Sequence, residues 1–259
     1  MTSEPASPAA AAAAAAPTRA GLPWRGVRLD CALSAVTLVG VSTLMIVPIV
    51  MLHVAGLAAA GTPDMGPIMP AITAAAIVAM LVTAGVVWWL RGRKLAARLA
   101  RMAPVRAYGV ALAAGVVIQV FAQCFTWLMA QSGAAMEPSN AQPVTALVQS
   151  APWLAWLLIV AVGPFAEELL MRHVLLRRFA VAGYAGIGLV LTSVAFALLH
   201  EPMPTEAGVG PWLVGLAMYT GMGAAFAWVY LYTGRFRAAF LAHAACNAMA
   251  LVLAAYSAS

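Results

Sequence analysis

The sequence predicts an all-α fold, a polytopic transmembrane helical bundle of about seven helices, with an eighth left open. Hydrophobic residues make up 64% of the chain and charged residues only 8%, and the mean hydropathy is +0.93. In soluble globular domains about a quarter of the residues are charged, so this composition excludes that class. The apolar residues also fall into long runs, and about 20 helical residues cross the hydrocarbon core of a bilayer.

Seven apolar segments are long enough to span. They run over residues 31–57, 68–90, 108–132, 150–179, 184–200, 211–232 and 238–256. An eighth span would change only the side on which the C-terminus lies. Residues 1–30, rich in Ala, Pro and Ser, predict a disordered cytoplasmic tail. Residues 31–133 then form a transmembrane scaffold, and residues 150–256 form a second transmembrane region that holds most of the polar membrane residues.

Apart from Arg172, which lies within the fourth span, the Lys and Arg residues occur in alternate connecting segments, before the first span and after the second, fourth and sixth. The basic residues of these segments are Arg19, Arg25 and Arg28, then Arg91, Arg93, Lys94, Arg98, Arg101 and Arg106, then Arg177 and Arg178, then Arg235 and Arg237. The positive-inside rule therefore places the N-terminus in the cytoplasm, and the Arg- and Ala-rich composition favours a bacterial cytoplasmic membrane. The net charge of +6 follows from this topology. We expect a lipid bilayer as a partner and no nucleic acid.

Two adjacent glutamates, Glu167 and Glu168, interrupt the apolar segment 150–179. They are two of only eight acidic residues in the chain. A charged side chain at the bilayer centre costs about 2.5–3.5 kcal/mol on insertion scales, and such residues usually mark function. The pair is therefore the first candidate for a functional site.

Histidines on two later spans are expected to reach the same depth as these glutamates. The spans 150–179 and 184–200 are joined by a tight turn, and Glu167 and His200 each lie about sixteen residues, or about 24 Å of helix, from it. His243 and Asn247 are four residues apart in the last span and share one helical face. Three helices thus bring polar groups to one buried volume.

The residue types allow two kinds of chemistry. Glu168 and Arg172 are four residues apart and can form a supporting ion pair, which leaves Glu167, about 100° around the helix, as the working base. With His200 it can deprotonate a water, while His243 and Asn247 stabilise an oxyanion.

Alternatively, Glu167, His200 and His243 are competent zinc ligands, and zinc would activate the water directly. The residues alone leave both mechanisms open, so no cofactor is certain and zinc is the candidate.

The three motifs together resemble the CAAX prenyl protease and bacteriocin-processing (CPBP) family of intramembrane endopeptidases, also called the abortive-infection family. The motifs are Glu167-Glu168-x-x-x-Arg172, Phe196-x-x-x-His200 and His243-x-x-x-Asn247. The resemblance covers residues 150–256, which it identifies as a catalytic core. It implies Glu167 as the water-activating residue, His200 as its partner, and His243 with Asn247 as the oxyanion or ligand pair.

The sequence thus predicts an intramembrane endopeptidase that hydrolyses a peptide bond in a membrane or lipid-associated peptide or protein. One alternative is a catalytically silent binding or immunity protein of the same family. Another is a proton-coupled transporter, in which the carboxylates and histidines would form a relay. The absence of matching broken helices in the two halves weighs against a transporter.

Overall fold

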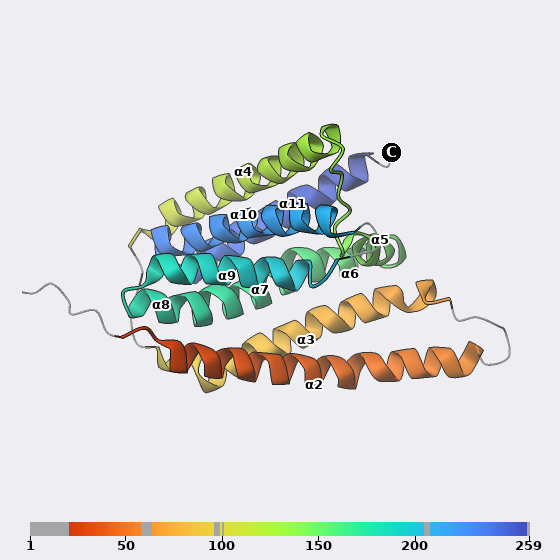
Figure 1. Ribbon diagram of the computed structural model, residues 1–259, viewed down its shortest axis with the longest axis horizontal. Coiled ribbons are helices and arrows are strands. Elements are labelled where there is room, and N and C mark those ends of the chain that lie inside the picture. The colour runs from red at the N-terminus through yellow and green to blue at the C-terminus, as the bar shows by residue number, and fades with distance from the viewer. Residues whose placement is uncertain (1–20, 58–63, 96–98, 100, 205–207, 258–259) are drawn as a thin grey trace, which may run out of the picture.

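The computed structural model describes residues 21–57, 64–95, 99, 101–204 and 208–257. All regular secondary structure among these residues is helical (Figure 1), which confirms the predicted all-α class. Six helices are long and apolar enough to cross a membrane, and a shorter apolar helix, α9 (Ala185–His200), packs against α10. The predicted polytopic helical bundle is confirmed.

Prolines and one glycine set several helix boundaries. Pro104 and Pro152 occupy first helical positions, where the missing N–H has no intrahelical acceptor to lose. Gly234 ends a helix with φ of 67°, a left-handed conformation that favours glycine. The six long helices are α2 (Trp24–Leu57), α3 (Met69–Leu90), α4 (Pro104–Gln131), the fourth span (Pro152–Val181), α10 (Val209–Thr233) and α11 (Phe236–Ser257).

Two expectations about the ends of elements need correction. Helix α2 begins at Trp24, so the predicted disordered tail, residues 1–30, is too long, and its residues 1–20 lie outside the described part of the chain. A further helix, α5 (Ala141–Ser150), occupies a stretch predicted as a connection between the scaffold and the core. It packs against α3 and the start of the fourth span.

The helices form three groups (Figure 1). Helices α2 and α3 pack together on one side, α4, α10 and α11 lie on the other, and the fourth span and α9 run between them. One apolar core fills the space among α4, α9, α10 and α11, and another joins α3 to the fourth span. The start of α2, the end of α3 and the α10–α11 turn all lie at one end of the bundle, the end predicted to face the cytoplasm.

Candidate active site

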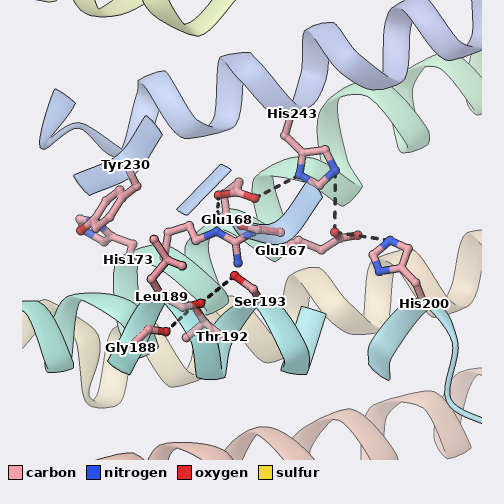
Figure 2. Close-up of polar contacts among 12 residues, drawn as sticks. Glu167, Glu168, His173, Gly188, Leu189, Thr192, Ser193, His200, Tyr230 and His243 are labelled. Carbon is pink, nitrogen blue, oxygen red and sulfur yellow. Dashed lines mark hydrogen bonds and ion pairs between the residues drawn. The ribbon is translucent and has the colours of Figure 1, made fainter. Parts of the chain in front are cut away.

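The fourth span holds both glutamates in a short α-helical piece between two π-helical segments. π-helical turns are rare and often occur at functional sites. The pieces are α6 (Pro152–Ala155), the π-helical η3 (Trp156–Val162), α7 (Gly163–Glu168), the π-helical η4 (Leu169–Leu176) and α8 (Arg177–Val181). Glu167 and Glu168 therefore end a single α-helical turn and a half, and their side chains leave the helix in different directions (Figure 2).

In the first π-helical segment one backbone carbonyl lacks a helical hydrogen bond, and Asn247 donates to it. The N–H of Gly163 bonds to the carbonyl of Leu158, five residues earlier. Pro164 has no N–H and cannot make the next bond in this register, which would go to Ile159. The Asn247 Nδ2 on α11 donates to that Ile159 carbonyl instead, at 2.9 Å. A proline in the fourth span thus gives the carboxamide of another helix a fixed position.

Glu167 places one carboxylate oxygen between two histidines (Figure 2). Its Oε2 lies 3.9 Å from Nε2 of His200 and 3.9 Å from Nε2 of His243. This oxygen is buried and accepts no hydrogen bond from any described residue. The separation is too long for a direct hydrogen bond, but a water between the groups could lie about 2.8 Å from each. The equal depth expected for Glu167 and His200 is confirmed.

The other nitrogens of the two imidazoles determine which atoms face Glu167. His200 Nδ1 lies 2.9 Å from the carbonyl oxygen of Phe196, and His243 Nδ1 lies 3.1 Å from Glu168 Oε1. A carbonyl and a carboxylate both accept, so each Nδ1 carries the hydrogen. In a neutral imidazole, each Nε2 then presents a lone pair toward Glu167. Two lone pairs and a carboxylate oxygen converge, which favours a hydrogen-bond donor such as water among them.

Glu168 and Arg172 form the ion pair that their spacing predicts. The Glu168 Oε2 and Arg172 Nε atoms are 3.2 Å apart, and both side chains are fully buried. Arg172 also donates from Nη2 to the carbonyl of Gly223 on α10, at 3.2 Å. Because the other Glu168 oxygen accepts from His243, this pair also orients the imidazole. The sequence did not predict that contact.

Aromatic rings pack against both histidines, and most of these rings were not predicted from the sequence. His200 stacks on Tyr219, with ring centroids 4.5 Å apart, and lies 4.4 Å from Phe196. His243 stacks on Phe226 at 4.3 Å. Phe196 belongs to the second motif, but nothing in the spacing of α10 distinguishes Tyr219 or Phe226 from other aromatic residues of the bundle. Ring packing fixes the χ angles that aim each Nε2.

Two cavities meet at these residues. A larger one, about 530 Å³, lies among α2, α3, α5 and the fourth span, and Glu167 lines it. A smaller one, about 270 Å³, lies among α4, α5, α10 and α11, and His243 lines it. Both cavities are lined by Asn140, Val144, Ile159, His200 and Asn247. The groups predicted for catalysis thus lie where the two cavities adjoin.

The arrangement does not fit a tetrahedral zinc ion. Ligand atoms about 2.1 Å from such an ion lie about 3.4 Å from one another. The Glu167 oxygen is 3.9 Å from each imidazole nitrogen. Within the described ranges, no three His, Cys, Asp or Glu side chains are placed to hold a metal ion. The zinc alternative therefore gains no support from the geometry.

The chain was also compared with known proteins. No curated protein and no solved structure matches it. Residues 149–249 match a family model described as type II CAAX prenyl endopeptidase Rce1-like. This range contains all three motifs and agrees with the resemblance to the CPBP family. Residues 149–249 of this integral membrane protein therefore form an Rce1-like domain.

Proposed function

We propose that the protein is an intramembrane endopeptidase that activates water with Glu167 and His200. One observation carries this proposal. A buried, unpartnered Glu167 oxygen lies 3.9 Å from two imidazole nitrogens and faces a cavity of about 530 Å³. A structural carboxylate in a membrane helix would be paired, as Glu168 is. The unpaired oxygen indicates a place for a reactant.

The reaction needs a water bound among Glu167, His200 and the peptide carbonyl. Glu167 takes a proton from this water as its oxygen attacks the carbonyl carbon, forming the C–O bond of a tetrahedral intermediate. Collapse of the intermediate breaks the C–N bond. The proton held by Glu167 passes to the leaving nitrogen, so the site returns to its starting state with a carboxylic acid and an amine released.

Asn247 and His243 are the candidate donors for the oxyanion of the intermediate. Asn247 uses one Nδ2 hydrogen for Ile159, which leaves the second hydrogen for a substrate oxygen. His243 is the second candidate donor, from Nε2 in its doubly protonated form, and Glu168 Oε1, 3.1 Å from its Nδ1, orients the ring for this role. Donors held in advance of the reaction are worth about 2.7–4 kcal/mol each in other hydrolases.

The larger cavity supports a membrane-embedded or lipidated substrate. Its lining is mostly apolar and comes from several helices, with Leu38, Ile72, Ile77, Met80 and Leu158 among the side chains. No Lys or Arg is among the described residues that line either cavity. An aliphatic chain or an apolar peptide segment would therefore fit there, with the scissile bond at the junction of the cavities.

The proposal is tested by proteolysis in nanodiscs with the wild-type protein and Glu167→Gln. Substrates are a farnesylated CAAX peptide and a library of bacterial membrane peptides, with the metal content of the same samples measured. Loss of a proton acceptor at Glu167 should lower kcat by at least about 10²-fold with the melting temperature preserved. Glu137→Gln, a variant of an exposed glutamate in the loop after α4, is the matched control.

Two outcomes would contradict the proposal. Full cleavage by Glu167→Gln would remove Glu167 from the chemistry. Failure of folded wild-type protein to cut any peptide, with normal biological activity in Glu167→Gln cells, would favour the catalytically silent binding or immunity protein.

A further inference from the structure

The loop between α4 and α5 is hydrogen-bonded to Glu201, the residue that follows His200. The buried carboxylate of Glu201 accepts hydrogen bonds from Ser139, from the backbone N–H at 3.0 Å and from the hydroxyl. The loop ends at Asn140, next to that anchor. Asn140 is therefore held at a fixed distance from the end of α9, where His200 lies.

Asn140 lies at a helix N-cap, where an asparagine side chain usually forms a capping hydrogen bond. It is the N-cap residue of α5, but its side chain makes no capping hydrogen bond. Asn is among the preferred N-cap residues because its oxygen normally accepts from an N–H of the first helical turn. Departures from such local rules concentrate at functional sites.

The carboxamide is instead oriented by a residue that touches the candidate active site. Its Oδ1 accepts from the Tyr219 hydroxyl at 3.3 Å, and the Tyr219 ring stacks on His200. With Oδ1 turned to Tyr219, the Nδ2 group has no acceptor among the described residues. Asn140 lines both cavities, as His200 and Asn247 do. Asn140 is exposed, so its amide hydrogens are open to a substrate that passes from one cavity to the other.

We propose that Asn140 is a substrate-binding residue whose Nδ2 donates to a backbone carbonyl of the bound polypeptide beside the scissile bond. This inference rests on the proposed peptidase function. A peptide that extends through two mostly apolar cavities carries amide groups that have little water to bond, and each unpaired group is costly. A fixed donor at the junction of the cavities lowers that cost and sets the register of the chain relative to Glu167.

The test uses two variants that separate substrate binding from structure. Asn140→Ser retains a good N-cap residue but is too short to reach the substrate. Asn140→Asp keeps an acceptor for Tyr219 and replaces the Nδ2 donor with a carboxylate oxygen. Gln142→Ala, which removes an exposed carboxamide two residues further along α5, is the control because Gln142 lines neither cavity.

Two quantities are measured in nanodiscs with a fluorescent farnesylated CAAX peptide. One is KM for cleavage by the otherwise wild-type protein, and the other is Kd for binding to protein that also carries Glu167→Gln. Loss of one hydrogen bond to a buried partner should raise both constants about tenfold in Asn140→Ser and Asn140→Asp. We expect kcat to change less than KM, and Gln142→Ala to leave KM, Kd and the melting temperature unchanged.

The outcomes distinguish this inference from the function on which it rests. If the peptide is cleaved and both Asn140 variants keep the parent KM and Kd, the inference fails and the peptidase stands. The inference also fails if Asn140→Ser is impaired and Asn140→Asp is not. Asn140→Asp keeps the acceptor for Tyr219 and lacks the amide donor, so that result would show that only the contact with Tyr219 matters. If the peptide binds in an Asn140-dependent way but is never cleaved, Asn140 is a polypeptide-binding residue, and the peptidase function fails together with the placement of Asn140 beside a scissile bond. A peptide that neither binds nor is cleaved overturns both.

Discussion

Two buried carboxylates, Glu168 and Asp30, hold arginines in very different parts of the molecule. Glu168 pairs with Arg172 one turn further along the fourth span and accepts from His243 of α11. Asp30 on α2 accepts from Arg91, just after α3, and from Arg178 of α8 at 2.5 Å. The first cluster supports the candidate active site. The second ties α2, whose other described side chains are all at least partly exposed, to the rest of the bundle.

The two clusters differ most in their access to solvent. The Arg172 side chain is 0% exposed, whereas Arg178 and Arg91 remain 16% and 28% exposed. An arginine that loses its carboxylate can turn toward water or lipid headgroups at the second cluster but has nowhere to turn at the first. The same kind of ion pair should therefore contribute differently to stability at the two places, because an unpaired charge is costly only where it stays buried.

The largest expected effect is that of Glu168→Ala. Removing this carboxylate leaves Arg172 buried without its counterion and His243 Nδ1 without its acceptor. Breaking one side of a buried pair typically costs about 3–5 kcal/mol, so we expect a large drop in the melting temperature measured in detergent. Cleavage should fall as well, because the His243 ring is no longer oriented.

The double variant Glu168→Leu, Arg172→Met separates these two effects. Apolar side chains of similar volume often replace a buried pair without loss of stability, so the melting temperature should return close to that of the wild type. Cleavage should stay about 10²-fold low because His243, a proposed oxyanion donor, has lost the carboxylate that orients it. Recovery of activity together with stability would show that the pair has only a structural role.

A smaller effect is expected for Asp30→Asn. The amide oxygen still accepts a hydrogen bond, and both arginines can reach solvent, so we expect a loss of about 1–3 kcal/mol. Amide hydrogen exchange should rise at the start of α2 and change little in α10 and α11. Asp64→Asn, at the only other aspartate in the chain, is the control. Equal destabilisation by Asp30→Asn and Glu168→Ala would contradict the solvent-access explanation.

The candidate site could be located from sequence because its geometry follows from helix arithmetic. The Glu168–Arg172 pair needs only a spacing of four residues, and the hairpin brings Glu167 and His200 to one depth by equal distances from a turn. His243 was correctly placed near Glu167 by its depth in the last span. Its contact with Glu168 depends on the rotation of α11, which periodicity does not give.

The second cluster could not be found in the same way. Asp30 meets partners 61 and 148 residues away in the sequence, and no local spacing encodes such pairs. Its position beside a polar, Ala-rich stretch also made it look like part of a tail. The π-helical segments escaped prediction for a related reason. They are held by tertiary contacts such as the Asn247 bond to Ile159, and local helix propensity does not specify them.

The smallest effect on stability is expected where α2 lines the larger cavity. Ser42 faces that cavity, and α2 is loosely covered there, so Ser42→Phe should change the free energy of unfolding by less than about 0.5 kcal/mol. The added ring would instead occupy substrate space and raise KM for the farnesylated peptide several-fold. Leu44→Phe, at a position 77% exposed on the outer side of the same helix, should leave KM unchanged. If Ser42→Phe instead destabilised the protein as much as Asp30→Asn, α2 would be held along its length rather than chiefly at Asp30.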